Sequence, residues 1–376
     1  MGQRIMFTMG DIACAEGALS AGCRYFGGYP ITPATEIAEW MSQRMPEVGG
    51  AYVQFEDEIA SITSVIGASW AGTKAMTATS GPGASLMMEA VGLAVMTETP
   101  LVLVNIMRGG PSTGQPTRGQ QGDVMQAKWG SHGDYQVIAL TPASVQEMFD
   151  QTVTAFNLSE KYRVPVFILA DEVVGHMREK LVIPDEKDIH TVYRKQPTVD
   201  PSMYRPFKPD EDLVPPMALL GSKYQFYATG LTHDEQGYPS DSDSVQIELV
   251  QRLSDKILKH SDDIIEVEEF MLDDAEIGVI AYGTPSRSAK SAIKVAREDG
   301  IKAGLLRLKT VWPFPKEHIA RLASHVKKLV VPEQNLGQVY YMVRAEAGTT
   351  PVHLMPKPAG TPHLPSEILQ KIRELA

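Results

Sequence analysis

An almost continuous apolar run over residues 101–107 is the feature that most restricts the fold of this chain. Such a run is typical of a central strand in a parallel sheet, because a strand of that kind is buried on both faces. Other strand-like segments alternate with helix-like segments through residues 1–185. They are residues 25–30, 52–55, 74–79, 135–140 and 164–170. This alternation predicts an α/β fold in which helices cover both faces of a parallel sheet.

Residues 186–265 interrupt the alternation. This stretch is rich in Pro, Asp and Tyr, and its one convincing helix is predicted over residues 244–264. His233 within it is expected to be a solvated loop residue, because no partner with metal-binding or triad spacing accompanies it. Alternation returns in residues 266–376, with strands predicted at 277–282, 303–308 and 327–331. We therefore expect two α/β domains, residues 1–185 and 266–376, joined by an irregular excursion.

Composition narrows the function classes. The net charge of −11 disfavours nucleic acid or an anionic membrane as a partner. No apolar run is long enough to cross a bilayer, and the first residues lack a signal-peptide pattern, so we expect a cytoplasmic protein with no membrane span.

The cysteine and histidine pattern predicts no metal site in this chain. Cys14 and Cys23 fall in the first helical pattern and are expected to be buried free thiols. An iron–sulfur cluster takes about four thiolates, which is more than this sequence contains. Neither a Cys-x-x-Cys motif nor a His/Cys zinc spacing occurs.

Two strand-to-helix junctions carry polar residues. In Tyr-Pro-Ile-Thr-Pro at 29–33, Thr32 has the position of an N-cap and Pro33 that of the first helical residue. Local chemistry allows either a structural cap or a hydroxyl that also contacts a ligand. Ser-Gly-Pro-Gly at 80–83 allows either a tight turn or a set of backbone N–H groups that bind an anion.

A buried carboxyl is expected near these junctions. Ligands bind outside the carboxyl ends of the strands in open parallel sheets, and Thr32, Glu58, Ser80 and Arg108 would gather there. Glu58 is either a carboxylate that favours a helix dipole, a role that its acidic neighbours could fill, or a carboxyl with a raised pKa. In the second case it could share a proton with a heterocycle nitrogen.

Arg108 ends the central strand and precedes two glycines. Its guanidinium could hold a carboxylate in bidentate fashion, or it could be a surface arginine at a strand end. Residues 108–123 are predicted to form a long polar loop, and such loops are often functional. Arg118, Lys128 and His132 could meet a second carboxylate, although solvated loop charges are the simpler interpretation.

Several motifs in one order resemble a single family. They are Tyr-Pro-Ile-Thr-Pro at 29–33, Phe-Glu-Asp-Glu-Ile-Ala at 55–60, Thr-Ser-Gly-Pro-Gly at 79–83 and Arg-Gly-Gly-Pro-Ser-Thr-Gly at 108–114. Together they resemble the alpha subunits of the 2-oxoacid:ferredoxin oxidoreductases. The resemblance continues through Thr-Gly-Leu-Thr-His-Asp-Glu at 229–235, Thr-Val-Trp-Pro-Phe-Pro at 310–315 and Glu-Gln-Asn-Leu-Gly-Gln at 333–338. Within the family, the chain most resembles members that act on 2-oxoglutarate.

The resemblance implies a thiamine-diphosphate enzyme that converts a 2-oxoacid and coenzyme A to acyl-CoA and carbon dioxide while reducing ferredoxin. Residues 1–185 would be a pyrimidine-binding-type thiamine domain, and residues 266–376 would be like the C-terminal domain of transketolase. Glu58 matches a glutamate that bonds the N1′ nitrogen of the aminopyrimidine. Thr32 and Arg108 match residues that hold the carboxylate end of the substrate. Pro30, Ser80 and Gly81 are expected to line the same cofactor site.

The sequence has no Gly-Asp-Gly with a downstream Asn, which is the usual metal–diphosphate signature of such enzymes. The resemblance then implies that a beta subunit supplies the diphosphate site, its Mg²⁺ and a [4Fe-4S] cluster, and that this chain is inactive alone. Some family enzymes add a ferredoxin-like subunit. Two alternatives stay open. One is pyruvate or a branched-chain 2-oxoacid as the substrate, although Ser112, Thr113, Gly114 and Arg118 suit a dicarboxylate better. The other is a non-catalytic assembly module with the same fold.

Overall fold

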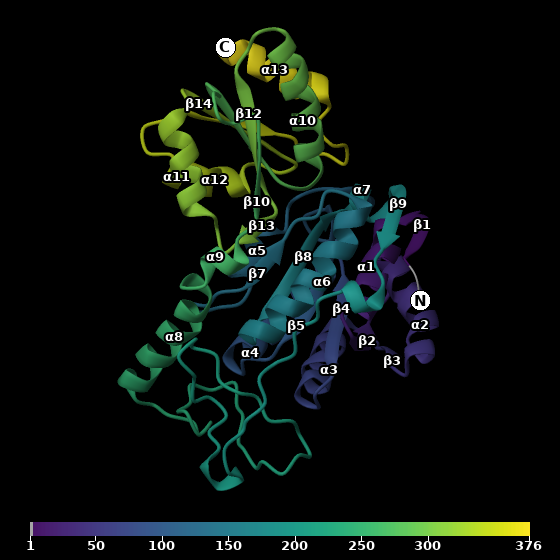
Figure 1. Ribbon diagram of the computed structural model, residues 1–376, viewed down its shortest axis with the longest axis vertical. Coiled ribbons are helices and arrows are strands. Elements are labelled where there is room, and N and C mark those ends of the chain that lie inside the picture. Colours follow the sequence, from purple (N-terminus) through teal and green to yellow (C-terminus); the bar gives the residue numbers. More distant parts are fainter. Residues whose placement is uncertain (1–2) are drawn as a thin grey trace.

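Parallel strands form the larger of the two main sheets in this computed structural model, which describes residues 3–376 (Figure 1). The sheet is 8-stranded, and β13 and β6 run antiparallel to their neighbours. In spatial order its strands are β13 (Thr310–Trp312), β7 (Ile138–Leu140), β8 (Pro165–Asp171), β5 (Leu101–Gly109), β4 (Lys74–Thr79), β2 (Cys23–Gly28) and β3 (Ala51–Gln54), with β6 (Gln115–Gly119) beside β5. The predicted parallel sheet is confirmed.

Helices cover both faces of this sheet, as the alternation predicted. On β5, Val102 and Val104 pack into one layer of helices, while Leu101 and Leu103 pack into the other. Successive side chains of a strand point to opposite faces, so a doubly covered strand needs apolar residues at consecutive positions. The first layer holds α1 (Gly10–Ser20), α2 (Thr35–Arg44) and α6 (Val145–Tyr162), and the second holds α3 (Glu58–Trp70) and α4 (Pro82–Met96).

A small ribbon and three short helices complete this lobe. β1 (Arg4–Met9) pairs antiparallel with β9 (Arg178–Ile183). α7 (Glu172–His176) follows the carboxyl end of β8 and packs against α1. A 3-10 turn (Pro46–Val48) follows α2, and α5 (Val124–Trp129) follows β6.

Residues 186–265 extend from the far end of the larger sheet, opposite the C-terminal lobe (Figure 1). Buried charges anchor them: Arg194 Nε donates to Glu160 Oε2 at 2.8 Å, and Glu98 accepts from Arg252 at 2.6 Å and Lys256 at 2.8 Å. The single predicted helix is two helices, because the chain turns after Leu258. The elements of this stretch are the 3-10 turns Glu186–Asp188 and Pro201–Met203, α8 (Asp243–Leu258) and α9 (Ser261–Ile264).

His233 is not solvated, so the prediction for this residue was wrong. Its side chain is only 1% exposed, and Nδ1 lies 2.8 Å from the carbonyl oxygen of Leu231. The ring centroid lies 4.0 Å from that of Phe207. The loop folds back onto this aromatic ring, and a sequence without visible partners for His233 could not indicate that contact.

The C-terminal lobe is a second α/β unit, as predicted. Its sheet is 5-stranded and parallel except for β10. In spatial order the strands are β10 (Val267–Phe270), β12 (Ala303–Leu308), β11 (Ile277–Ala281), β14 (Lys328–Glu333) and β15 (Val352–Pro356). α10 (Gly283–Glu298) and α13 (Pro365–Leu375) cover one face, and α11 (Lys316–His325) and α12 (Gln338–Glu346) cover the other.

Gln121 connects the two lobes at the carboxyl edge of the larger sheet. Its Nε2 donates to Asp171 Oδ1 at 3.0 Å, at the end of β8. Its Oε1 accepts from the Gln334 backbone N–H at 3.1 Å, and its carbonyl accepts from Asn335 Nδ2 at 2.7 Å. In addition, β13 leaves the second lobe to pair with β7. The edge at which the site residues were expected therefore faces the second lobe.

Thr32 does not cap a helix, which corrects the prediction. Residues 31–34 form a turn closed by a 2.8 Å hydrogen bond from Ala34 N–H to the Ile31 carbonyl, and α2 begins only at Thr35. A residue before proline is disfavoured in the helical region. The Thr32 carbonyl, which an N-cap would offer to the helix, accepts from Arg108 instead.

Thr141-Pro142 has the same Thr-Pro sequence as Thr32-Pro33, and it does not begin a helix either. The N-cap of α6 is Ser144, whose Oγ accepts from the Glu147 N–H at 3.1 Å. Thr141 instead donates its hydroxyl to the Leu308 carbonyl at 2.7 Å, so it ties α6 to the second lobe.

Two further details differ from the sequence predictions. Residues 108–123 are not an open loop, because β5 runs on to Gly109 and β6 pairs with it. Cys23 lies in β2 rather than in the first helix, although both cysteines are buried free thiols as predicted.

Candidate functional site

Arg108 is held at the carboxyl edge by backbone carbonyls. Its Nη1 donates to the Thr32 carbonyl at 2.7 Å and its Nη2 to the Thr113 carbonyl at 3.0 Å. The residue is 6% exposed, and within residues 3–376 its Nε finds no hydrogen-bond partner. Burial lowers the pKa of Arg108, and the charges of Asp123 and Glu58 oppose that shift. A buried guanidinium fixed in this way, with a donor to spare, is suited to receive an anion.

Glu58 is a buried carboxyl that the helix does not need. Asp57 is the N-cap of α3, and its Oδ1 accepts from the Ala60 N–H at 2.8 Å. Glu58 begins the helix and is 5% exposed. Burial raises the pKa of Glu58 and Asp57 adds to the rise, while the Arg108 charge opposes it. The capping role therefore belongs to the neighbouring aspartate, and Glu58 is left available for chemistry.

Gly83 leaves room for this carboxyl. A Cβ atom at residue 83 would lie 2.4 Å from Glu58 Oε1 and 2.1 Å from Thr79 Oγ1. Any larger residue would displace Glu58 from the turn that follows β4. Gly81 in the same turn has φ +40°, and its Cβ position lies 3.5 Å from Arg108 Cγ. The small residues thus bring the turn into contact with both charged groups.

The Ser80–Gly83 turn does not present the anion cradle that was one reading of the sequence. Gly81 N–H donates to Asn105 Oδ1 at 3.3 Å, and Gly83 N–H donates to the Ser80 carbonyl at 2.9 Å. The Ser80 hydroxyl is buried and donates to the Ile106 carbonyl at 2.7 Å. These donors are consumed inside the protein, because the turn packs against the end of β5.

The remaining predicted residues differ in exposure. Pro30, Thr32, Arg118 and His132 are all exposed to solvent. Lys128 is not a solvated charge: it is 5% exposed and its ammonium group donates to the Tyr135 carbonyl. It is therefore already engaged and is not a candidate for a second substrate carboxylate.

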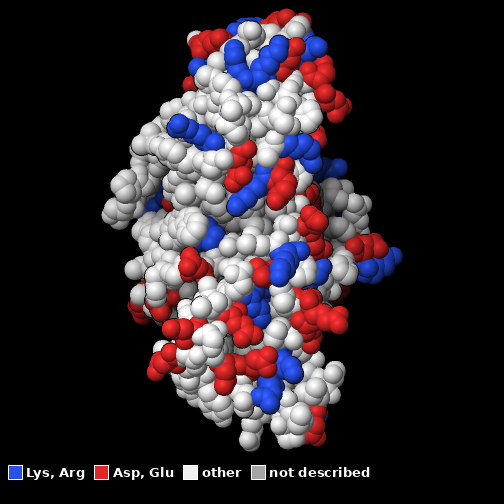
Figure 2. All heavy atoms as spheres, turned by 90° about the vertical axis from the view of Figure 1, so that its left-hand side faces the viewer, with Lys and Arg blue, Asp and Glu red and all other residues white. Residues whose placement is uncertain are grey.

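A groove of about 950 Å³ opens beside Arg108 between the two lobes. The larger lobe contributes Gly81, Arg108 and Asp123, and the second lobe contributes Leu336 and Tyr341, which are both well exposed. Over the face seen in Figure 2, basic and acidic side chains are interspersed around hollowed, uncharged surface. The site is thus a cleft at the sheet edge with walls from distant parts of the sequence.

Sequence reasoning missed two polar residues here. Asn105 lies in the buried strand β5, and its Nδ2 donates to Asp123 Oδ2 at 3.0 Å. Burial raises the pKa of Asp123, while the Asn105 hydrogen bond and the Arg108 charge oppose the rise. A single amide within the apolar run of residues 101–107 was the available signal, since a polar group in such a strand needs a partner.

This arrangement combines three chemical capacities. Glu58 has a raised pKa that favours the protonated carboxyl, Arg108 can bind an anion, and the groove can accept an extended ligand between the lobes. The rim residues Pro30 and Thr32 are open to solvent on this chain. The structure therefore brings Thr32, Glu58, Gly81 and Arg108 together at one edge, as the sequence predicted.

Comparison with family models matches most of the chain. Residues 16–252 match the thiamine diphosphate-binding model of pyruvate flavodoxin/ferredoxin oxidoreductases, and residues 275–368 match core domain II of pyruvate:ferredoxin oxidoreductase. No helix within residues 3–376 has the length and apolar character needed to span a membrane.

Curated relatives and a solved structure match nearly the full chain. The 2-oxoglutarate synthase subunit KorA of Methanothermobacter thermautotrophicus is 56% identical, over 98% of this chain and 98% of the relative. The ketoisovalerate oxidoreductase subunit VorB of Methanothermobacter marburgensis is 39% identical, over 98% and 97%. The 2-oxoglutarate:ferredoxin oxidoreductase from Magnetococcus marinus, solved with 2-oxoglutarate, coenzyme A and succinyl-CoA bound, has a TM-score of 0.94 and 36% identity. That match covers 99% of this chain and 65% of the other.

Proposed function

Because this chain belongs to the alpha subunits of the 2-oxoacid:ferredoxin oxidoreductases, we propose that it works with a beta subunit to convert 2-oxoglutarate and coenzyme A to succinyl-CoA and carbon dioxide, with ferredoxin as the electron acceptor. The preference for 2-oxoglutarate is supported by 56% identity to a 2-oxoglutarate synthase subunit, against 39% to a ketoisovalerate subunit over a similar length.

The observation that carries the site assignment is the pairing of a buried carboxyl with a buried arginine whose Nε has no partner within residues 3–376. Glu58 has its pKa raised by burial at one sheet edge, and the Arg108 guanidinium lies close enough to oppose that shift. Thiamine diphosphate, when bound, supplies the nucleophilic carbon and the electron sink for decarboxylation. Gly83 leaves room for the Glu58 carboxyl at this edge, where such a carboxyl could pair with a nitrogen of a planar heterocycle.

Each residue of this chain then has a defined task. Glu58 holds a proton at the N1′ nitrogen of the aminopyrimidine, a role that burial favours because it raises the pKa of this carboxyl. Arg108 and Thr32 bind and orient the substrate carboxylate, with Arg108 supplying the charge. Pro30 and the backbone of Gly81 border the cofactor, while the Ser80 hydroxyl is occupied and only shapes the turn.

The partner supplies the remaining groups. The two cysteines of this chain are buried, and burial raises the pKa of each thiol to about 12, so neither favours the thiolate that binds iron. We therefore assign the diphosphate site, its Mg²⁺ and the [4Fe-4S] cluster to the beta subunit, and ferredoxin or a ferredoxin-like subunit takes the electrons. We also propose that the enzyme is cytoplasmic.

A substrate panel tests this function. The reconstituted alpha–beta complex is assayed for viologen reduction with 2-oxoglutarate, pyruvate and 2-oxoisovalerate, each with coenzyme A. We expect the highest kcat/KM with 2-oxoglutarate. A preference for pyruvate or the branched-chain acid would agree with the family assignment but would reject 2-oxoglutarate as the preferred substrate. Absence of turnover with all three, in a complex that contains its cofactors, would favour a non-catalytic assembly role.

A further inference from the structure

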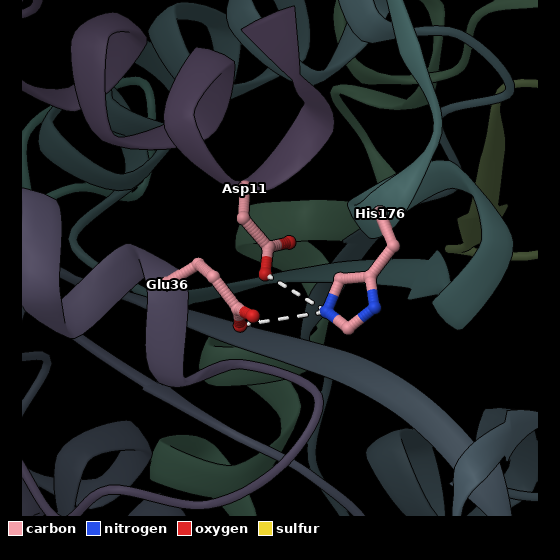
Figure 3. A group of neighbouring side chains, drawn as sticks. All are labelled: Asp11, Glu36 and His176. Atoms are coloured by element: carbon pink, nitrogen blue, oxygen red, sulfur yellow. Dashed lines mark ion pairs between the residues drawn. The ribbon is translucent and has the colours of Figure 1, made fainter.

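Three side chains of types that can bind a metal lie next to the turn of residues 31–34, and none of them has a role assigned above. Asp11 comes from the start of α1, Glu36 from the first turn of α2 and His176 from the end of α7 (Figure 3). One ligand atom from each of the three lies within 4.8 Å of the other two. They are 165 residues apart from first to last (176 − 11), so only the fold brings them together.

Asp11 is the unusual member of this group. Its side chain is 0% exposed, and neither carboxylate oxygen has a hydrogen-bond donor among residues 3–376. Buried carboxylates are normally hydrogen-bonded, ion-paired or bound to a metal. Figure 3 shows one Asp11 oxygen directed at the space between Glu36 and the His176 ring. The carboxylate therefore points at the position that a bound cation would occupy.

The distances within the group suit a metal better than direct hydrogen bonds. His176 Nε2 lies 3.4 Å from Glu36 Oε2 and 3.8 Å from Asp11 Oδ2. A charged N–H···O hydrogen bond measures about 2.7–2.9 Å. Metal–ligand bonds of about 2.0–2.2 Å would place neighbouring ligand atoms of a tetrahedral ion roughly 3.3–3.6 Å apart. The Pro33 carbonyl oxygen, hydrogen-bonded to Nε2 at 3.1 Å, adds a third oxygen and so a fourth potential ligand atom at the same place.

The second nitrogen of His176 has the environment that metal-binding histidines use. Nδ1 faces Glu172 Oε1 at 3.5 Å, one helical turn earlier on α7. A carboxylate on the far side of the ring favours a proton on Nδ1, so that Nε2 could exchange its hydrogen bond to the Pro33 carbonyl for a bond to the metal.

The charges of the group also favour a bound cation. Three carboxylates, Asp11, Glu36 and Glu172, surround one imidazole. A divalent cation would neutralise the two that face Nε2. We propose that Asp11, Glu36 and His176 bind one divalent transition-metal ion of the Zn²⁺ or Mn²⁺ type, since one imidazole with carboxylate and carbonyl oxygens suits these ions.

The site would stabilise the turn that carries Thr32. Pro33 lies in this turn and Glu36 follows it, and the Thr32 carbonyl accepts the hydrogen bond from Arg108. A metal bound by α1, α2 and α7 would fix the turn in addition to this hydrogen bond. It is separate from the Mg²⁺ expected in the beta subunit, because all its ligands lie in this chain.

Metal binding by the purified full-length chain tests the site. The chain is stripped with a chelator, dialysed and titrated calorimetrically with ZnCl₂ and, separately, with MnCl₂. We expect one saturable site per chain for at least one of these ions. Asp11→Asn and His176→Gln should weaken it by about tenfold or more. Glu39→Gln, an exposed glutamate on the same helix, should bind as the wild type does.

A change at the buried Asp11 could unfold the chain, so Glu36→Gln provides a second variant at a partly exposed position. Circular dichroism is used to check that each variant is folded. Loss of binding in folded Glu36→Gln and His176→Gln would support the site. No saturable binding of either ion, or equal binding by the wild type and these variants, would overturn it. The readout is metal affinity, so the result is independent of whether the complex turns over 2-oxoglutarate.

Discussion

The guanidinium of Arg108 donates a 2.7 Å hydrogen bond to the backbone carbonyl of Thr32, 76 residues away in the sequence. This bond joins the end of β5 to the turn before α2. It also explains why Thr32 does not cap that helix, since its carbonyl is already used. The Arg108 side chain therefore contacts Thr32 at the rim of the cleft and also lies near the buried carboxyl of Glu58.

Glu58→Gln tests the proton-holding role. The amide keeps the size of the side chain but cannot share the carboxyl proton, so kcat of the assembled complex should fall by about 100-fold or more. Thiamine diphosphate content and subunit assembly are measured alongside turnover and should change little. The control is Glu56→Gln, an exposed residue in the same segment, which should keep wild-type kcat. Wild-type turnover in Glu58→Gln would remove Glu58 from this role.

Arg108→Ala tests binding of the substrate carboxylate. Loss of a charged contact in a desolvated site costs about 2–4 kcal/mol, or roughly 30- to 800-fold in kcat/KM, mainly through a higher KM. Steady-state kinetics with 2-oxoglutarate measure this, and the exposed Arg178→Ala serves as the control. If KM and kcat/KM of Arg108→Ala equal those of the wild type, the carboxylate assignment is wrong.

Gly83→Ala tests the placement of Glu58 without changing its chemistry. The added methyl would lie 2.4 Å from Glu58 Oε1, so the carboxyl must move. We expect a loss of about 1–3 kcal/mol in stability and about tenfold or more in kcat. The matched control is Gly67→Ala in α3, where an added Cβ meets nothing within 4 Å. That change should raise stability by about 0.5–1 kcal/mol and leave kcat unchanged.

Glu98→Gln tests the buried charges that anchor residues 186–265. Burial raises the pKa of Glu98, but Arg252 and Lys256 outweigh it and hold the pKa well below its usual value of 4.5. The carboxylate therefore stabilises the fold above that pH, and its contribution is lost as the pH falls below about 4.5. At pH near 7 the variant should lose about 3–5 kcal/mol, because two cations remain buried without their partner.

Denaturant unfolding at several pH values measures this effect, with the exposed Glu89→Gln as the control. The difference between wild type and Glu98→Gln should shrink on acidification. A difference that stays constant from neutral to acidic pH would show that Glu98 does not act through its charge.

Much of the fold could be predicted because local pattern and tertiary structure agree. The apolar run of residues 101–107 became the central strand β5, and residues 74–79 became β4 with the predicted bounds. The same reasoning failed at Thr32 and at Ser80–Gly83. At Thr32, the Arg108 side chain bonds the carbonyl that was expected to accept the first hydrogen bond of a helix. At Gly81, the Asn105 side chain bonds the N–H that was expected to be available for an anion.

Only those site residues that lie next to the end of a strand could be predicted from the sequence. Glu58 and Arg108 were found because each follows or ends a strand at the edge where ligands bind. The second-lobe wall of the groove depends on the docking of two lobes, which no local pattern encodes. The group of Asp11, Glu36 and His176 was missed for the same reason, since its members have no short, regular spacing.

Mixing separately purified subunits tests the central claim most directly. The claim is that this chain supplies Glu58 and Arg108 to a thiamine site completed by a beta subunit. Succinyl-CoA formation from 2-oxoglutarate and coenzyme A, with ferredoxin as acceptor, is measured for each subunit alone and for the mixture. We predict no product from either subunit alone and steady turnover from the mixture. Product formation by the beta subunit alone at the rate of the mixture, or none from a cofactor-loaded mixture, would contradict the account.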